Sequence, residues 1–259
     1  MTLSTTESLP KVALVTGGAR RIGRAIVETL ANLGFAVAIH HHRSADEAKT
    51  LVEAIRTKGG RAIALKADLS DESAVASLVP QAEQALGPLG LLVNNASFFE
   101  YDAALSATRE SWDRHIETNL RAPFVLIQAF ARRLPAGAEG VVVNLIDQRV
   151  WNLTPHFLSY TVSKAGLWTL TQTLALALAP RIRVNALGPG PTLPSARQTP
   201  AQFAAQCARM PLKRGASTDE VARAVRFILE APSMTGQMIA LDGGQHLGWS
   251  PSADERIEE

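Results

Sequence analysis

Short apolar segments that alternate with helical segments constrain the fold of this chain more than any other feature. The apolar segments are rich in valine, leucine, isoleucine and alanine, and their length is typical of buried strands. They lie at 11–16, 35–40, 62–67, 91–94, 141–145, 182–186 and 238–241. Helical periodicity occupies 21–33, 44–58, 71–86, 110–120, 120–134 and 158–179. This alternation predicts an α/β fold with one doubly wound parallel sheet and helices on both faces.

The bulk properties are those of one globular domain. A chain of 259 residues fits a single large α/β domain, and we find no interdomain linker or internal repeat. Hydrophobic residues make up 46% of the chain and charged residues 19%, which is typical of a soluble protein. We therefore expect one domain over 1–259, with flexible ends at 1–10 and 251–259.

Charge and cysteine content exclude several classes of partner. The net charge is only +2 and the cations are scattered, so no nucleic-acid-binding patch is expected. The single cysteine, Cys207, indicates a reducing compartment. The first ten residues lack the apolar core of a secretory signal, and 166–179 is too short and polar to span a bilayer. These features predict a cytoplasmic protein without a membrane partner.

A glycine-rich turn joins the first strand to the first helix. Its sequence, Thr-Gly-Gly-Ala-Arg-Arg-Ile-Gly over 16–23, follows a strand and opens a helix, as in a dinucleotide-binding loop. A plain tight turn is the alternative. Arg21 stands where such a loop usually has its central glycine, so its side chain is expected over the phosphates and within reach of a ligand. The predicted cofactor contacts here are Gly17, Arg20, Arg21, Ile22 and Gly23.

The end of the second strand favours NADPH over NADH. An acidic residue there would bind the ribose hydroxyls and repel a 2′-phosphate, but this chain has His-His-His-Arg-Ser over 40–44. We predict that His42, Arg43 and Ser44 bind the 2′-phosphate, with Ser44 also the N-cap of the next helix. The alternative is a solvated strand exit. We favour a non-ligand role for His40 and His41, and no metal-site spacing surrounds them.

Polar residues follow the third and fourth strands. Asp68 is placed to meet the adenine edge of a cofactor or to cap the next helix, and Leu69 follows it. The run Asn94-Asn95-Ala96-Ser97 ends the fourth strand at the same edge of the sheet. We predict that Asn95, Ala96 and Ser97 contact the cofactor. Asn119 is either structural or the anchor of a water molecule beside Lys164.

Tyr160 and Lys164 predict a proton-transfer site. At i and i+4 they share one face of a helix, and an ammonium beside a phenol stabilises the phenolate. Asp147, at the end of a strand in front of this pair, adds a second proton carrier. The alternative for Asp147 is a helix cap or a loop acid. A proton relay opposite a nucleotide-binding loop indicates redox chemistry.

Taken together, these motifs resemble the short-chain dehydrogenase/reductase family. The resemblance rests on the glycine loop, Asn94-Asn95-Ala96, Asn119, Tyr160-x-x-x-Lys164, Arg183-Val184-Asn185, Gly188-Pro189-Gly190 and Leu241-Asp242-Gly243-Gly244. It implies a Rossmann-type fold, a nicotinamide cofactor that also contacts Gly190, and usually a homotetramer. It makes Tyr160 the proton donor, gives Lys164 the roles of binding ribose and lowering the Tyr160 pKa, and places Asn119 in the relay.

Within that family the chain is similar to the pteridine reductases. The family normally has serine where this chain has Asp147, and the pteridine reductases have aspartate. Arg21 and the stretch 40–48 also resemble that subgroup. The segment Asn95-Ala96-Ser97-Phe98-Phe99 resembles the one whose aromatic residue stacks on the pterin, which implies stacking by Phe99 and a contact from Ser97. The predicted substrate contacts are Arg21, Ser97, Phe99, Asp147 and Tyr160.

The chemistry of a pterin fits these residue types. A flat, polar heterocycle needs an aromatic face, a cation for its carbonyl side and a proton donor for a ring nitrogen, and a carboxyl group serves an imine nitrogen better than serine does. The main hypothesis is therefore an NADPH-dependent pteridine reductase, acting on a pterin, a dihydropterin or dihydrofolate. A reductase of ketones, sugars or acyl groups and a non-catalytic NADPH-binding regulator are the alternatives.

The sequence leaves the roles of several aromatic residues undecided. Phe98 is expected in the core, and an ordinary core position is also the alternative for Phe99. The segment 148–157, with Trp151, Leu153, His156 and Phe157, shapes either the pocket or a subunit contact. Trp249 reaches a neighbouring subunit's site or lies on the surface.

Overall fold

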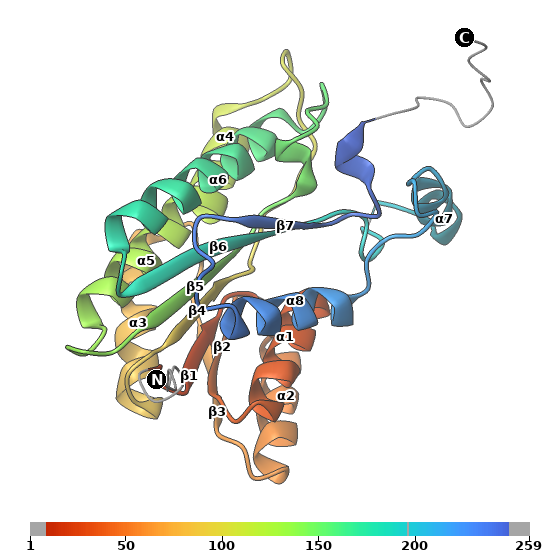
Figure 1. Cartoon of the computed structure of the whole chain (residues 1–259). Coiled ribbons are helices and arrows are strands. Elements are labelled where there is room, and N and C mark those ends of the chain that lie inside the picture. The colour runs from red at the N-terminus through yellow and green to blue at the C-terminus, as the bar shows by residue number, and fades with distance from the viewer. Residues whose placement is uncertain (1–8, 196, 249–259) are drawn as a thin grey trace, which may run out of the picture.

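The fold is a seven-stranded parallel sheet between two layers of helices (Figure 1). The computed structural model describes residues 9–195 and 197–248. The strand order is β3-β2-β1-β4-β5-β6-β7, with every neighbouring pair parallel. The strands are β1 Val12–Val15, β2 Ala36–His41, β3 Ala62–Lys66, β4 Leu91–Asn94, β5 Gly140–Leu145, β6 Ile182–Pro189 and β7 Met238–Leu241. The predicted doubly wound Rossmann-type sheet is confirmed.

The helices cover both faces of the sheet, as predicted. On one face lie α1 (Arg21–Asn32), α2 (Ala45–Thr57) and α8 (Thr218–Glu230). On the other lie α3 (Glu72–Leu86), α4 (Arg109–Ile116), α5 (Ala122–Arg133) and α6 (Leu158–Leu178). The short helix α7 (Pro200–Ala208) stands apart from both layers, beyond the carboxyl end of β6 (Figure 1).

Alternation along the strands builds the two halves of the core. Ala13 and Val15 of β1 pack toward α1, α2 and α8, whereas Val12 and Leu14 pack toward α3, α5 and α6. Successive side chains of a strand point to opposite faces, so a strand covered on both sides must be apolar throughout. This is why the predicted strands could be recognised as continuous apolar runs.

Several local expectations were wrong. The prediction missed α7 and α8, although each begins with a capping box, Thr199 with Gln202 and Ser217 with Glu220. The cap of α3 is Asp71, whose carboxylate accepts from the main chain of the first turn, so Asp68 is not a helix cap. Ser44 holds the N-cap position of α2 but makes no side-chain capping bond.

The parallel arrangement brings the predicted site residues to one end of the molecule. The carboxyl ends of β1, β4, β5 and β6 meet where the strand order reverses between β1 and β4, the usual ligand site of such sheets. Trp249 lies outside the described residues. Among the described helices, none is long and apolar enough to cross a membrane.

Candidate active site

The glycine loop is closely packed against the end of β4. Gly17 has φ +60°, and a Cβ built there would lie 3.1 Å from Ala96 Cα. A Cβ at Gly23 would lie 2.1 Å from Gly17 O, so any side chain would break the turn. The Asn95 side-chain amide donates to Thr16 O at 2.9 Å and to Gly17 O at 3.1 Å. Asn95 and Ala96 therefore support the loop, which keeps its backbone open to a ligand.

His40 supports the same loop from β2, a role that the sequence did not reveal. Its Nδ1 accepts from Gly17 N at 3.1 Å, and its Nε2 faces Ala67 O at 3.2 Å. This pairing requires the neutral imidazole with its proton on Nε2. Burial lowers the pKa of His40 from 6.5 to about 4, which keeps the ring neutral. His40 and His41 are both buried, so the interpretation of these two as a solvated strand exit was wrong.

The predicted 2′-phosphate residues cluster beyond the end of β2. His42 and Arg43 are exposed, and Ser44 begins α2. His42 Nε2 lies 3.6 Å from Asp68 Oδ2, while the other carboxylate oxygen of Asp68 accepts from Ser70. Leu69 is buried, and Arg20 forms a long, exposed ion pair of 3.5 Å with Glu47. The exposed basic groups leave this corner open to an anion.

Arg21 connects the glycine loop to the segment after β6. Its φ is +54°, the left-handed conformation that a glycine would adopt at this position. Its guanidinium donates to Pro194 O at 3.0 Å and to Leu193 O at 3.3 Å. Arg21 lines the pocket with its two terminal nitrogens engaged by loop carbonyls, and its contact with the phosphates or a ligand stays a prediction.

Asp147 serves two neighbours, one through each carboxylate oxygen. Oδ2 accepts from the Tyr160 hydroxyl at 3.0 Å. Oδ1 accepts from Arg149 N at 2.8 Å and caps η2, the 3₁₀-helix Gln148–Val150. The two alternatives for Asp147, proton carrier and cap, are thus both present in its geometry. Lys164, buried beside Tyr160, donates to Leu145 O at 2.8 Å.

The electrostatics of this group differ from the expectation. Burial raises the pKa of Tyr160 well above its ordinary value, and the charge and hydrogen bond of Asp147 raise it further. The Arg149 charge and a hydrogen bond from Ser97 oppose the rise. Burial lowers the pKa of Lys164 to about 8, against the opposing effect of Asp147. The prediction of a lowered Tyr160 pKa was therefore wrong for this structure, in which the phenol is protonated at neutral pH.

Asn119 braces the segment after β4. It lies in a π-helical turn, Glu117–Arg121, and is fully buried. Its Oδ1 accepts from Phe98 N at 2.7 Å and from Ser97 Oγ at 3.3 Å. Its Nδ2 donates to Phe98 O at 2.9 Å and to Ser163 Oγ at 3.0 Å. These side-chain bonds fit the structural alternative for Asn119, and its place in a relay stays a prediction.

These residues surround a cavity of about 340 Å³ at the carboxyl ends of the strands. Its walls include nine of the nineteen predicted site residues: Arg21, Ile22, Asn95, Ser97, Phe99, Asp147, Tyr160, Lys164 and Gly190. The Phe99 ring forms one wall. Its centroid lies 4.6 Å from the Tyr160 ring centroid in an edge contact and 4.5 Å from the Phe157 ring centroid, on which it stacks. Trp151 instead contacts Trp168 and His246.

Sequence reasoning did not name several residues of this cavity, although two of them lie in the segment 148–157 that it left open between the pocket and a subunit contact. They are Gln148, Arg149, Thr192, Leu193, Phe203, Gln206 and Gln245. Most come from η2, α7 and the segment after β7, whose approach to β5 depends on the tertiary fold. A signal existed only for Arg149 and Gln148, which directly follow Asp147 in the chain.

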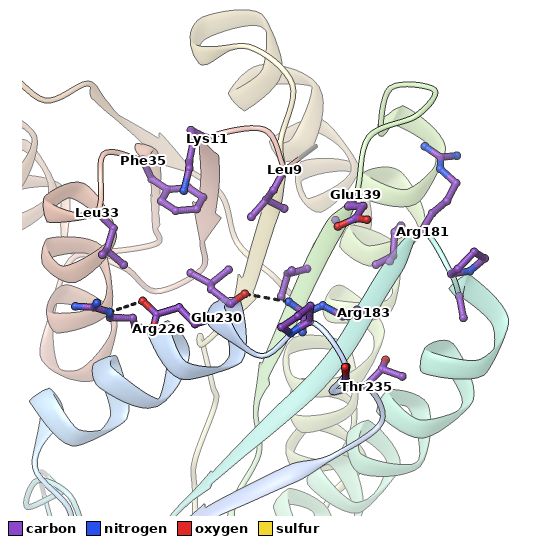
Figure 2. A pocket seen from close by; sticks show the side chains of 18 residues that line it. Leu9, Lys11, Leu33, Phe35, Glu139, Arg181, Arg183, Arg226, Glu230 and Thr235 are labelled. Atoms are coloured by element: carbon purple, nitrogen blue, oxygen red, sulfur yellow. Dashed lines mark hydrogen bonds and ion pairs between the residues drawn. The ribbon is translucent and has the colours of Figure 1, made fainter. Parts of the chain in front are cut away.

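A larger cavity of about 530 Å³ lies at the opposite end of the sheet (Figure 2). It is lined by residues around the amino ends of β1, β5 and β6, including Lys11, Glu139 and Arg183. The Arg183 guanidinium donates to main-chain carbonyls at the end of α8, and Arg226 pairs with Glu230 at 2.7 Å. It contains none of the predicted site residues, so we assign the active site to the smaller cavity.

Comparison with known proteins identifies the family of this chain. A family model described as enoyl-(acyl carrier protein) reductase matches residues 17–246. A short-chain type dehydrogenase/reductase from Picea abies is 32% identical over 91% of this chain and 92% of its own length. The chain belongs to the short-chain dehydrogenase/reductase family. The family predicted from the motifs is therefore confirmed.

Two further members of the short-chain dehydrogenase/reductase family carry more specific names. A crystal structure of FolM alternative dihydrofolate reductase 1 from Brucella canis, complexed with NADP, is 51% identical with a TM-score of 0.92, covering 96% of this chain and 98% of its own. The 3-oxoacyl-[acyl-carrier-protein] reductase FabG of Staphylococcus epidermidis is 32% identical over 92% of this chain and 99% of its own. The relatives thus include reductases of different substrates.

Proposed function

We propose that this protein is an NADPH-dependent reductase of pterins, with a dihydropterin or dihydrofolate as substrate. The observation that carries the proposal is the hydrogen bond of 3.0 Å between the Tyr160 hydroxyl and Asp147, in a cavity walled by Phe99. The likeness to a FolM alternative dihydrofolate reductase, at 51% identity, supports it.

The residues present fit NADPH. A Cβ at Gly23 would collide with Gly17 O, and Gly17 has a φ of +60° that favours glycine, as suits a loop that binds pyrophosphate through its backbone. Beyond β2, Arg43 and His42 are exposed and no acidic residue replaces them, which suits a 2′-phosphate. Lys164 and Gly190 line the adjoining cavity. When bound, NADPH supplies the hydride.

The chain's own residues supply and hold the proton. Reduction of a C=N bond adds a hydride to carbon and a proton to nitrogen. Tyr160 is protonated at neutral pH because burial and Asp147 raise its pKa, so the proton that it would donate is present on the hydroxyl. Asp147 fixes the direction of that hydroxyl through Oδ2 and is the second proton carrier beside it. Serine, with one oxygen and no charge, would do neither as well.

The walls of the cavity suit a flat heterocycle. Phe99 offers an aromatic surface, and its stacking on Phe157 holds the ring in position. Ser97 and Arg21 also face the cavity and supply polar contacts. An acyl chain or a simple ketone would use neither the aromatic wall nor the carboxylate.

NADPH oxidation tests the proposal directly. Purified protein is assayed with dihydrobiopterin, dihydrofolate, a panel of ketones and a 3-oxoacyl thioester, and pterin-dependent oxidation is expected. Turnover of ketones or acyl thioesters alone would refute the pterin proposal and favour a role like that of the FabG relatives. NADPH binding without any turnover would favour the non-catalytic regulator.

A further inference from the structure

A buried histidine lies behind the part of the active site that contains Phe99 and Tyr160. His115, the penultimate residue of α4, is fully buried and lines neither of the two cavities described above. Its ring centroid lies 4.7 Å from that of Phe98 and 6.1 Å from that of Tyr160. An unpaired buried polar group costs on the order of 1–3 kcal/mol, so the partners of its two ring nitrogens indicate what this side chain supports.

One ring nitrogen of His115 holds the segment that carries Phe99. Nε2 accepts from Glu100 N at 3.2 Å. On the other side of Phe99, Phe98 N and O are both bonded to the Asn119 side chain, at 2.7 and 2.9 Å. The main chain on each side of the aromatic wall is therefore anchored by one buried side chain.

The other ring nitrogen holds the first turn of α6, the helix that carries Tyr160. Nδ1 lies 2.9 Å from Ser111 O and 2.7 Å from Ser159 Oγ. A carbonyl oxygen only accepts, so the ring proton is on Nδ1, and Nε2 is then the acceptor that Glu100 N requires. Ser159 directly precedes Tyr160 in the chain. The imidazole thus bridges the aromatic wall and the helix of the proton donor.

Asp102 completes this buried network. Its Oδ1 accepts from Ser159 N at 3.0 Å, and its Oδ2 accepts from the hydroxyls of Ser159 and Ser111. Asp102, His115 and Ser159 are the residue types of a nucleophilic triad, but all three are buried and Nδ1 already carries a proton, so it cannot take one from the serine. Burial lowers the pKa of His115, against the Ser111 hydrogen bond and the Asp102 charge, so the ring is neutral at neutral pH.

We propose that His115 is a positioning residue that sets the placement of the aromatic wall, Phe99, relative to the proton donor, Tyr160. It acts through Glu100 N on one side and Ser159 Oγ on the other. The Phe99 and Tyr160 ring centroids are 4.6 Å apart, so a substrate stacked on the first lies beside the second. His115 itself touches neither substrate nor cofactor. The inference rests on the proposed function only for the substrate used in its kinetic test.

Two variants of similar shape separate the two halves of the bridge. H115N keeps an amide N–H near the place of Nδ1 but has no acceptor near Nε2, so it releases Glu100 N and the aromatic wall. H115Q puts an amide oxygen near the place of Nε2 but has no donor near Nδ1, so it releases Ser159 and the first turn of α6. Arg197, which pairs with Glu100 at 2.7 Å and donates to Phe99 O at 3.1 Å, is present in both.

The kinetic test uses dihydrobiopterin, with kcat expressed per NADPH-binding site so that unfolded protein is not counted. H115N should raise KM roughly tenfold with a smaller effect on kcat, because stacking on Phe99 is made in the ground state and the transition state alike. H115Q should lower kcat roughly tenfold with a smaller effect on KM, because the Tyr160 hydroxyl is misplaced for proton transfer. S159A removes the Nδ1 link from the other side and should reproduce the kcat loss, which keeps the test open if H115Q does not fold.

S111A is the matched control. It removes the hydrogen bond of 2.6 Å from Ser111 Oγ to Asp102 in the same network, but it leaves both links of His115 in place. It should lower the free energy of unfolding while KM and kcat per NADPH-binding site stay close to those of the wild type.

Crystal structures of the variants give a readout that needs no substrate. In H115N the distance between the Phe99 and Tyr160 ring centroids should exceed 4.6 Å while the Tyr160–Asp147 hydrogen bond persists. In H115Q the Tyr160 hydroxyl should move relative to Asp147 while the main chain around Phe99 stays in place.

The outcomes separate the inference from the proposed function. The same change of KM and kcat in H115N and H115Q, or parameters per site equal to those of the wild type, would overturn the role of His115. Unchanged positions of Phe99 and Tyr160 in the variant structures would overturn it as well. If the wild type reduces no pterin, the proposed function is refuted, and the variant structures still decide the role of His115.

Discussion

Acidification should destabilise this protein through His40. The His40 pKa is lowered to about 4 in the folded state from 6.5 for a free imidazole. The unfolded chain therefore binds more protons than the folded one between these values, and stability must fall as the pH drops from 6.5 to 4. The difference corresponds to about 3 kcal/mol, with a slope of up to about 1.4 kcal/mol per pH unit.

The contribution of His40 can be isolated with H40N. Asparagine Oδ1 lies at nearly the same place as imidazole Nδ1, so it can still accept from Gly17 N, but it does not titrate. Urea unfolding at fixed protein concentration, from pH 7 to pH 4, gives the stability of each protein. His41, His42 and Asp68 act on His40 and are present in both proteins, so subtracting the curves removes most of their own effect.

The wild type should lose about 3 kcal/mol more than H40N over this range. Any loss of the Ala67 contact shifts the H40N curve by a constant and does not change its slope. NADPH affinity should weaken over the same pH range in the wild type, because a protonated Nδ1 cannot accept from the glycine loop. Parallel stability curves for the two proteins would refute the assignment of His40 as a neutral, buried support of the loop.

Three further predictions concern the active site and its support. D147S should lower pterin turnover roughly 100-fold while NADPH affinity is retained. It should also lower the Tyr160 pKa measured in the pH–rate profile. Equal losses of turnover and NADPH binding would instead indicate that the role of Asp147 is structural. R43E should raise the Michaelis constant for NADPH about tenfold with little effect on NADH; an unchanged value would mean that the 2′-phosphate lies elsewhere. D102N should lower the free energy of unfolding by about 1.5–3 kcal/mol, because buried Asp102 accepts from Ser111 and from Ser159 at the start of α6. Burial raises the Asp102 pKa, but those hydrogen bonds outweigh it and leave the pKa lowered, so this stability should be present at neutral pH and lost on acidification in urea titrations.

The sheet could be predicted from sequence because its inner strands are buried on both faces. Strands β1, β2, β4 and β5 are buried throughout and are mostly apolar, and the helices between the strands leave only parallel connections. The prediction failed after β6, where a proline-rich loop breaks the pattern. Both α7 and α8 carry capping boxes that signal a helix start, and α8 also has buried residues at helical spacing. Those signals were present in the sequence and were not used.

The site was predictable where its residues follow strands and unpredictable where it depends on contacts between distant segments. Asp147, Asn95 and Gly190 meet because parallel strands end at one edge. The buried role of His40 depends on β2 lying between β1 and β3, which gives its two ring nitrogens main-chain partners. The raised Tyr160 pKa likewise depends on the burial of the phenol and then on its distance to Asp147, neither of which spacing in the sequence specifies.

Asp147 connects two parts of the active-site cavity. Its Oδ2 accepts from the Tyr160 hydroxyl, and its Oδ1 caps the 3₁₀-helix whose second residue is Arg149. The two oxygens have different partners, so a serine, with a single oxygen, could serve one of them but not both. The aspartate therefore sets the position of the Tyr160 hydroxyl and, through the cap, that of the short helix after β5. It follows that D147S should disturb this helix as well as the Tyr160 hydrogen bond.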